Sequence, residues 1–320
     1  MDPSDPVLVE VVRGGWVESV HRGRMVVLDG SGRATTDLGA VADAVLLRSC
    51  AKPLQAVAMV RAGWDPPTDR LALACASHDG TDAHLAVVRA TLAAAGLTEG
   101  DLGCPPGYAL DPEAGAYQRV TEGPDRIHHG CSGKHAAMLA TCRHRGWPTD
   151  GYLDPGHPLQ QAIRATVEEL AGTTAAHVAV DGCGAPVAAL PLSGLARAVA
   201  TVARGGPGTA EGRVADAMRR HPELVAGDRR SATRLMRAVP GLIAKDGAEG
   251  VYVAALPDGR AVAVKVDDGA VRASEVVVAS AIAHLVGEDD PAVDLDVLAD
   301  VALPDVEGGG RPVGEIRSVV

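Results

Sequence analysis

The sequence predicts an α+β fold, in which strands from both ends of the chain form one antiparallel sheet and helices fill the middle. Three observations support this prediction. The N-terminal region is rich in β-branched residues and divided by glycine turns, a hairpin pattern spans residues 251–266, and the pattern between residues 71 and 244 is mostly helical. Runs of strands separated from a run of helices are typical of α+β domains.

The N-terminal strands follow from local sequence. They are predicted at residues 7–12, 16–21 and 25–28. Gly14-Gly15 separates the first two, and Asp29-Gly30 is a hairpin signal. A helix is predicted to begin at Ser49, because Pro53 is best tolerated in the first turn of a helix.

Glycine and proline breaks divide the middle of the chain into predicted helices. These cover residues 82–95, 133–144, 157–170, 186–203 and 210–221. A short strand is predicted at residues 176–180, before Asp181-Gly182. Because repeats and linker-like stretches are absent from the sequence, we expect a single domain over residues 1–320, built of two intimate lobes.

The C-terminal part is predicted to return to the sheet. Two strands, at residues 251–256 and 261–266, flank a turn of Pro257-Asp258-Gly259-Arg260, and an apolar helix is predicted at residues 276–286. The last thirty or so residues are acidic and then glycine-rich. We expect them to pack loosely.

Composition excludes several classes of protein. The 320 residues are 47% hydrophobic but contain no Phe, so the core must be Ala, Val and Leu. A net charge of −11 without a basic stripe argues against nucleic-acid binding. No apolar run is long enough to cross a bilayer, and the acidic N-terminus lacks the features of a signal peptide, so we expect a cytoplasmic protein without a membrane partner. The six cysteines are too few and too scattered for a disulfide framework.

The run Arg48-Ser49-Cys50-Ala51-Lys52 contains the spacing of a lysine-activated serine. On a helix, positions i and i+3 share one face, so the Lys52 amine can reach the Ser49 hydroxyl. A nearby base that takes its proton turns serine into an effective nucleophile. The short pattern also fits a helix N-cap followed by a surface lysine.

Ser77-His78-Asp79-Gly80 is a second group of residues with catalytic side chains. Catalytic triads meet in space and not in sequence, so the run itself does not define one. The alternative is that Ser77 or Asp79 caps the helix predicted to begin near Thr81.

Two glycine-containing turns carry the remaining polar side chains. The first runs from His128 to His135, ahead of a predicted helix, and lacks the glycine spacing of a P-loop. The second is Asp181-Gly182-Cys183-Gly184. Cys131 and Cys183 could share a zinc ion with a third ligand, for which histidine is the ordinary choice, or they could be two unrelated buried cysteines.

Two lysines near the C-terminal hairpin could also face this region. Lys265 lies on a predicted strand, where its side chain points either toward the helix of Ser49 or toward water. Lys245 and Glu249 lie in a predicted turn and could form a surface ion pair of little energetic weight.

Taken in order, these motifs resemble the Rhizobium etli-type L-asparaginases, also called the asparaginase II or class 3 family. The similarity spans about residues 7–285. The motifs that carry it are Arg48-Ser49-Cys50-Ala51-Lys52-Pro53-Leu54-Gln55, Cys75-Ala76-Ser77-His78-Asp79-Gly80 with His84, Cys131-Ser132-Gly133-Lys134-His135, Asp181-Gly182-Cys183-Gly184 and Lys245-Asp246-Gly247-Ala248-Glu249-Gly250.

The resemblance implies a serine β-lactamase-like fold and the hydrolysis of L-asparagine to L-aspartate and ammonia by a homodimer. It implies two Ser–Lys pairs, Ser49 with Lys52 and Ser77 with Lys265. It also implies a zinc ion that assists substrate binding, held by Cys131, Lys134 and Cys183, and substrate contacts from Arg48, His135 and Asp181.

The chain departs from the family pattern at two places. His128-His129-Gly130 replaces a typical His-Asn-Asn run, and Cys104-Pro105-Pro106-Gly107-Tyr108 replaces Cys-Gly-x-His-x-Pro. These changes bear on substrate choice or on the level of activity, and not on the fold. The alternatives are a glutaminase or another serine amidohydrolase of the same fold, although the Lys-Thr-Gly strand of β-lactamases is missing, and a non-catalytic protein that binds zinc or an amino acid.

Overall fold

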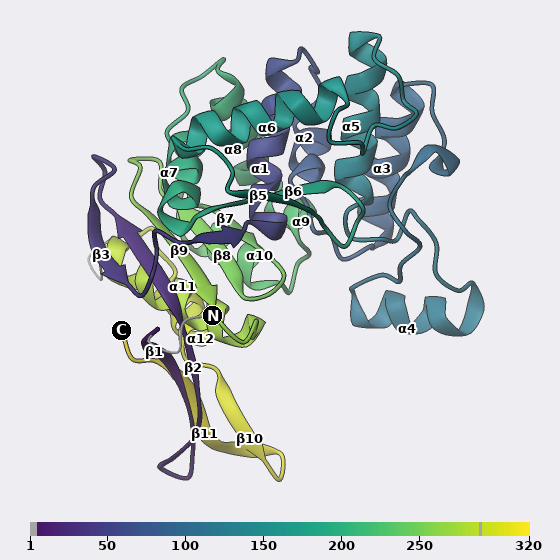
Figure 1. The fold of residues 1–320 in the computed structure, drawn as a ribbon. Coiled ribbons are helices and arrows are strands. Elements are labelled where there is room, and N and C mark those ends of the chain that lie inside the picture. The colour runs from purple at the N-terminus through teal and green to yellow at the C-terminus, as the bar shows by residue number, and fades with distance from the viewer. Residues whose placement is uncertain (1–4, 288–289) are drawn as a thin grey trace.

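The structure is a computed structural model that describes residues 5–287 and 290–320. The first four residues, on which the expectation of a missing signal peptide partly rests, lie outside the described residues. Most of the helices gather at one end of the molecule, and a long twisted sheet with two helices beside it lies toward the other, as Figure 1 shows. This arrangement confirms the predicted α+β class.

The main sheet has eight antiparallel strands from the two ends of the described chain. Its order is β10-β11-β1-β2-β9-β8-β7, and β3 pairs with β2 outside this path. The strands are β1 (Val7–Arg13), β2 (Trp16–Leu28), β3 (Ala34–Leu38), β7 (Ile243–Asp246), β8 (Val251–Ala255), β9 (Ala261–Val266), β10 (Asp305–Gly308) and β11 (Arg311–Ser318). Val11 lies opposite Ile316, and Met25 lies opposite Val264, so the sheet joins the two ends of the sequence.

A smaller sheet and the helical region come from the middle of the chain. The smaller sheet has the order β4 (Ala44–Leu46), β6 (Pro186–Pro191) and β5 (His177–Val180). The helices before β5 are η1 (Arg48–Ala51), α1 (Lys52–Arg61), α2 (Thr68–Ala74), α3 (Asp82–Ala94), η2 (Glu99–Asp101), α4 (Pro112–Thr121), α5 (Ser132–Arg145) and α6 (Pro158–Ala171). Those after β6 are α7 (Leu192–Ala203), α8 (Ala210–Arg220), α9 (Pro222–Val225), α10 (Ser231–Ala238), α11 (Val271–Val286) and α12 (Leu295–Ala302).

The centre of the main sheet is buried on both faces. Every residue of β8 is buried, and α7 and α11 both pack on β8 and β9. Buried strands with near-continuous apolar sequence are covered on both sides, so the two helices lie on opposite faces. The described residues contain no helix that is both long enough and apolar enough to span a membrane.

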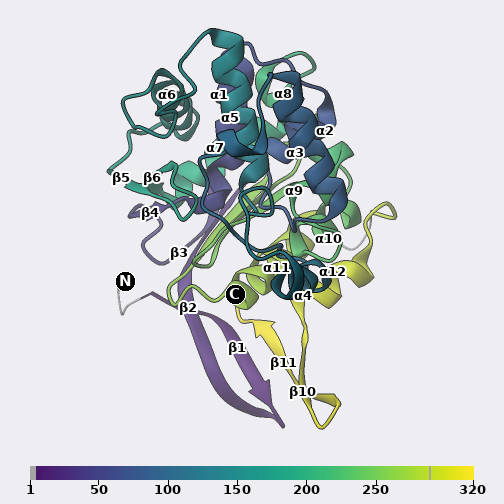
Figure 2. The same cartoon turned by 90° about the vertical axis from the view of Figure 1, so that its right-hand side faces the viewer.

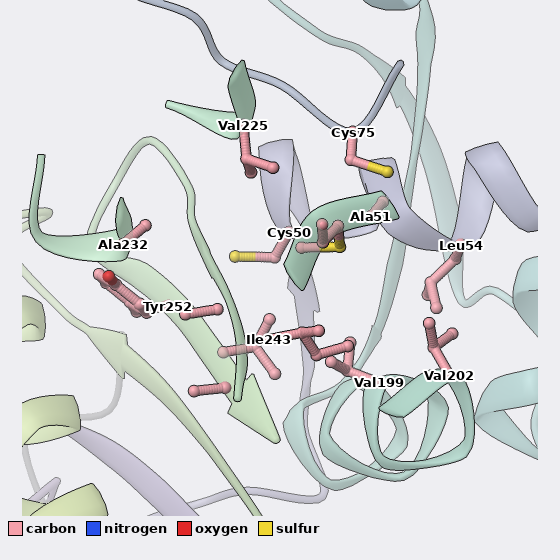
Figure 3. Packing of buried hydrophobic residues seen from close by; sticks show 14 of the residues in the cluster. Cys50, Ala51, Leu54, Cys75, Val199, Val202, Val225, Ala232, Ile243 and Tyr252 are labelled. Carbon is pink, nitrogen blue, oxygen red and sulfur yellow. The ribbon is translucent and has the colours of Figure 1, made fainter. Parts of the chain in front are cut away.

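Helix α1 is the central helix of the helical region. Residues 52–60 are all buried, and α1 packs against α2, α5, α6, α7 and α8. In Figure 3, Cys50, Ala51 and Leu54 lie near Val199 and Val202 of α7 and near the sheet. A polar side chain among residues 52–60 is therefore largely removed from water, and it must be satisfied within the protein or by a ligand.

The structure corrects four predictions of secondary structure. Residues 16–21 and 25–28 belong to the single strand β2, and residues 186–203 divide into β6 and α7. The helix expected to begin at Ser49 begins as the 3-10 turn η1 and becomes α-helical at Lys52. Strands β3 and β4 were not predicted.

The largest correction concerns the C-terminal residues, which do not pack loosely. β10 and β11 extend the sheet, as Figure 2 shows, with Val306 and Ile316 buried. Gly309 and Gly310 have positive φ angles in the turn between these strands, so the glycines form a hairpin. The side chain of Arg317 also pairs with Glu10 of β1 at 2.9 Å.

Candidate active site

Lys52 brings together three segments that are far apart in the sequence. Its Nζ donates to the Ala76 carbonyl at 2.5 Å, and it lies 2.9 Å from Ser77 Oγ and 3.2 Å from Cys131 Sγ. The side chain is only 1% exposed. Burial lowers the pKa of Lys52 against the opposing influence of Cys131, and two further buried lysines lower it again. A lysine in this state can serve as a general base toward a serine hydroxyl.

The structure pairs Lys52 with Ser77 and not with Ser49. Although Ser49 lies three residues before Lys52, it is not among the described residues to which Lys52 Nζ is hydrogen-bonded. The Ser77 backbone is held in place by its N–H, which donates to Val225 O at 3.0 Å. Ser49 is half-buried in η1, directly before the lysine helix. Ser49 is therefore close to Lys52 in the sequence. Of the two serines, Ser77 is the one that is hydrogen-bonded to Lys52 Nζ in the described structure.

Lys265 lies away from this group, in a separate cleft. We call the cleft lined in part by Arg24, Arg48, Glu249, Lys265 and Asp267 the Lys265 cleft. The Lys265 amine donates to the carbonyl of Glu249 at 2.7 Å and to that of Val266. The described structure thus contains no hydrogen bond of the expected pair between Ser77 and Lys265.

Lys245 is buried in β7 and not in the turn that its sequence predicted. A surface pair with Glu249 was one possibility, but Lys245 is 1% exposed, and its Nζ donates to Asp246 Oδ1 at 2.6 Å and to Asp246 O at 2.7 Å. It is one of the lysines that lower the pKa of Lys52. The signal for its burial was the apolar sequence Leu242-Ile243-Ala244 before it, which is typical of a strand covered on both faces.

A chain of ion pairs extends from Lys245. The Asp246 carboxylate also accepts from Arg230, and Arg230 Nη1 lies 3.3 Å from Asp79 Oδ1. Burial opposes the charge of Asp246, but Lys245 and Arg230 hold the pKa of this carboxyl well below its ordinary value. This network anchors the segment that follows Ser77, and it explains why Asp79 does not cap the next helix: the N-cap of α3 is Thr81.

Cys131, Lys134 and Cys183 lie near one another around Lys52. Lys134 Nζ lies 3.0 Å from Cys183 Sγ, and Lys52 Nζ lies 3.2 Å from Cys131 Sγ. Cys131 is the N-cap of α5, and Cys183 lies in the turn between β5 and β6. We call Lys52, Ser77, Cys131, Lys134 and Cys183 together the Lys52 centre.

The two thiols have opposite pKa shifts. Interaction with Cys183 lowers the pKa of Cys131 well below its ordinary value despite burial, with help from Lys52. Interaction with Cys131, followed by burial, raises the pKa of Cys183. Burial opposes the charge on Lys134, but the two sulfur atoms raise the pKa of its amine. Of the two thiols, Cys131 is therefore the one that loses its proton more readily.

This donor set fits a zinc ion. Lys134 Nζ lies 3.0 Å from Cys183 Sγ, Cys131 is close enough for both groups to shift its pKa, and thiolate and nitrogen ligands are those that zinc prefers. Within residues 5–287 and 290–320, no group of three or more His, Cys, Asp and Glu side chains is placed to hold a metal. A metal here therefore requires Lys134 as the third donor, in its neutral form.

Arg48 connects the Lys52 centre with the Lys265 cleft. Its Nε donates to Asp181 Oδ1 at 2.8 Å, and Asp181 Oδ2 lies 3.9 Å from Cys183 Sγ. Arg48 has a φ of 48° and Glu249 a φ of 61°, which make them the non-glycine residues with positive φ in the described chain, and both line the cleft. Strained backbone of this kind is concentrated at functional sites.

His135 is buried beside the donor set with one ring nitrogen unused. The Tyr152 hydroxyl accepts from the Gly103 N–H at 2.8 Å and is hydrogen-bonded to His135 Nδ1 at 2.6 Å. His135 Nε2 has no partner among the described residues. Burial lowers the pKa of His135 well below its ordinary value, which favours a neutral ring.

His78 is a structural residue in this arrangement. The Gly80 N–H donates to His78 Nδ1 at 3.1 Å, so Nε2 donates to Ser132 Oγ at 2.8 Å, and the Ser132 hydroxyl donates to Ile127 O at 2.7 Å. These bonds fix the segment after Ser77 to the start of α5. His78 thus fixes the position of Ser77 relative to Cys131, and both of its ring nitrogens are used in structural hydrogen bonds.

The chain matches one family of known proteins over almost its whole length. A sequence model of the family described as L-asparaginase II matches residues 9–318. No curated protein was found to match the chain. Among solved structures, a candidate beta-lactamase from Bacteroides dorei DSM 17855 is similar, at 14% identity and a TM-score of 0.42, over 77% of this chain and 84% of that one.

Proposed function

This chain belongs to the L-asparaginase II family, and from that premise we propose that it hydrolyses the side-chain amide of L-asparagine to L-aspartate and ammonia. The observation that supports this proposal most directly is the distance of 2.9 Å between Lys52 Nζ and Ser77 Oγ inside a buried site. A buried lysine in contact with a serine is the arrangement of an activated nucleophile.

In the first chemical step, neutral Lys52 takes the proton of the Ser77 hydroxyl while the oxygen attacks the amide carbon of the substrate. The proton then passes from Lys52 to the leaving nitrogen, the C–N bond breaks, and ammonia departs. Water next attacks the resulting ester with Lys52 again as the base, which releases aspartate and restores the serine. Ser49 is the alternative nucleophile, because η1 places it directly before Lys52.

Three further residues are proposed to bind the substrate. Arg48 is suited to the α-carboxylate and Asp181 to the α-ammonium group, and their mutual hydrogen bond of 2.8 Å positions both. His135 Nε2 is buried without a hydrogen-bond partner among the described residues, and a polar group of the substrate would supply one. Buried polar groups are normally satisfied, which is why this vacancy supports a ligand-binding role.

Zinc is proposed as the resident metal of the donor set. Cys131, Cys183 and neutral Lys134 would hold it, and a bound zinc ion supplies a Lewis acid that can orient a substrate oxygen or nitrogen. The short distance of 3.2 Å between Lys52 and Cys131 means that the same lysine contacts both the metal-binding residues and the serine. A homodimer remains the prediction for the assembly, and light scattering coupled to size-exclusion chromatography would test it.

The test is ammonia release from L-asparagine and L-glutamine by the purified chain, with its metal content determined on the same sample. We expect release from L-asparagine that is lost in Lys52→Ala and in Ser77→Ala. Ser49→Ala distinguishes the two serines: if it alone abolishes turnover, Ser49 is the nucleophile. Full activity of Lys52→Ala would contradict the Ser–Lys mechanism, and no release from either amide would contradict the proposed reaction.

A further inference from the structure

The Lys265 cleft adjoins the Lys52 centre and has room for more than a free amino acid. Its empty volume, open mouth included, is about 800 Å³, and none of the residues of the Lys52 centre lines it. Arg48 is the lining residue that reaches that centre, through its hydrogen bond of 2.8 Å to Asp181. Arg48 therefore marks the boundary between the reaction site and a space that the hydrolysis of free asparagine does not use.

One wall of the cleft is the free edge of β4. Ala44, Val45 and Leu46 all line it, and because successive side chains point to opposite faces of a strand, the cleft must run along the edge. The other edge of β4 pairs with β6, where the Leu47 N–H donates to Ala188 O at 3.1 Å. Inward and outward residues alternate along an antiparallel pair, so the N–H and C=O of Leu46 face away from β6. Leu46 thus offers a backbone donor and a backbone acceptor to an extended chain in the cleft.

Another part of the lining carries two cations directly opposite each other. Arg24 of β2 and Lys265 of β9 are partners in the register of the main sheet, and like charges at such positions are destabilising. Arg24 is compensated by the buried carboxylate of Asp5 at 2.6 Å. The Lys265 amine is hydrogen-bonded only to backbone carbonyls among the described residues, although Glu249 and Asp267 line the same cleft. This half-buried ammonium group is therefore available to an anion that enters the cleft.

On the basis of the proposed function, we propose that the Lys265 cleft extends the substrate site, so that the protein also deamidates asparagine at the N-terminus of short peptides. Arg48 lines the cleft and Asp181 does not, so the α-carboxyl end of a bound asparagine faces the cleft. A peptide that continues from this end pairs its second residue with Leu46, as peptides add to free strand edges. Its terminal carboxylate accepts from the Lys265 amine. The reaction itself is unchanged: water replaces the nitrogen on the side-chain carbonyl carbon, the C–N bond breaks, and ammonia leaves an N-terminal aspartate.

The test compares ammonia release by the unmodified full chain from L-asparagine, from the tripeptide Asn-Ala-Ala and from the same tripeptide with a C-terminal amide. We expect kcat/KM for the tripeptide to lie within about tenfold of the value for L-asparagine. The free carboxylate should give about tenfold higher kcat/KM than the C-terminal amide, the value of one hydrogen bond to a charged group. A tripeptide value below this range would overturn the proposal and leave the proposed reaction intact. Equal values for the acid and the amide would overturn the contact with Lys265.

Two further measurements locate the peptide in the cleft. Lys265→Met should remove the advantage of the free carboxylate over the amide, and Lys265→Arg should restore it. N-methylation of the second peptide residue removes the N–H that donates to Leu46 O, and it should lower kcat/KM about fivefold without any change to the protein. An advantage of the carboxylate that survives in Lys265→Met, or an N-methylated peptide that reacts as fast as its parent, would overturn the proposed placement.

A binding measurement separates this proposal from the proposed reaction. If no substrate releases ammonia, the proposed reaction fails, and calorimetry of Asn-Ala-Ala with the unmodified chain then decides the role of the cleft. Saturable binding that weakens about tenfold in Lys265→Met would support the peptide site. Absence of binding, or binding of equal strength in Lys265→Met, would overturn it.

Discussion

The Lys52 centre and the Lys265 cleft present lysine in two opposite environments. Lys52 is fully buried, in contact with a serine hydroxyl and a thiol, and surrounded by other lysines. Lys265 is half-buried in an open cleft, where two backbone carbonyls hold its amine. Burial lowers the pKa of both amines, but only Lys52 has a nucleophile within reach. A lysine with a lowered pKa can therefore act as a general base only where a hydroxyl or thiol lies within hydrogen-bonding distance of its amine.

Four predictions test this difference, and the first has the largest expected effect. Lys52→Met removes the base that contacts Ser77 and should lower kcat for L-asparagine by about 1000-fold, within the range measured for general bases. Lys265→Met is the matched control and should change kcat by less than about tenfold. Steady-state ammonia release measures both variants, and equal losses would remove the distinction between the two lysines.

The second prediction compares the two lysines through stability. Lys245→Met leaves the buried Asp246 carboxylate with only Arg230, and it should lower the free energy of unfolding by about 3 kcal/mol. Lys265→Met removes only hydrogen bonds to carbonyls at a half-exposed position, so it should cost about 1 kcal/mol or less. Urea unfolding followed by circular dichroism measures both. If Lys245→Met had the same free energy of unfolding as the unmodified chain, the ion pair between Lys245 and Asp246 would not stabilise the fold.

The third prediction concerns Lys134, the amine of the Lys52 centre that faces sulfur. Lys134→Met removes the nitrogen donor of the proposed zinc site and should weaken zinc binding by about 100-fold or more, since loss of an outer-shell partner alone typically costs about 10- to 100-fold. Competition with a chromophoric chelator measures the affinity, and Lys265→Met serves again as the control. Unchanged zinc affinity in Lys134→Met would exclude this lysine as a ligand.

The smallest expected effect is a pH dependence. The folded-state pKa of Asp246 is lowered, so its contribution to stability is complete above the unfolded-state pKa near 4 and is lost as pH falls toward the folded-state value. Between pH 7 and pH 3 this carboxyl should account for about 1 kcal/mol of the stability lost. Asp246→Asn should be less stable at pH 7 but should lose correspondingly less on acidification, and an identical acid profile would assign the loss to other groups.

Local turn chemistry made parts of the fold predictable. The hairpin of β8 and β9 was identified because Pro257-Asp258-Gly259-Arg260 specifies a turn without help from the rest of the chain. β11 was missed because it contains proline, glycine and charged residues, and its strand conformation is imposed by pairing with β1. The division of residues 186–203 was missed because apolar β6 continues directly into apolar α7.

The sequence indicated which residues to consider for the site, but not which of them contact one another. The convergence of Cys131, Lys134 and Cys183 was expected from resemblance, whereas spacing alone favoured histidine as the third donor. The contact of Lys52 with Ser77 joins residues that are separated by 25 positions, and no local pattern specifies such a contact. Lys245 was assigned to a turn because the glycines that follow it indicate one, although Lys245 itself lies in the buried strand β7.

The pairing of β1 with β11 has a consequence for how the chain is made. During synthesis β1 leaves the ribosome before β11, and β2, which follows it directly, can cover one of its edges at once. Its other edge has no partner until β11 emerges. An unpaired strand edge can pair with other chains, so the growing chain carries an exposed edge while all the residues between β1 and β11 are made. The sheet cannot be completed before β11 has been synthesised, and chaperones that shield strand edges would act before that point.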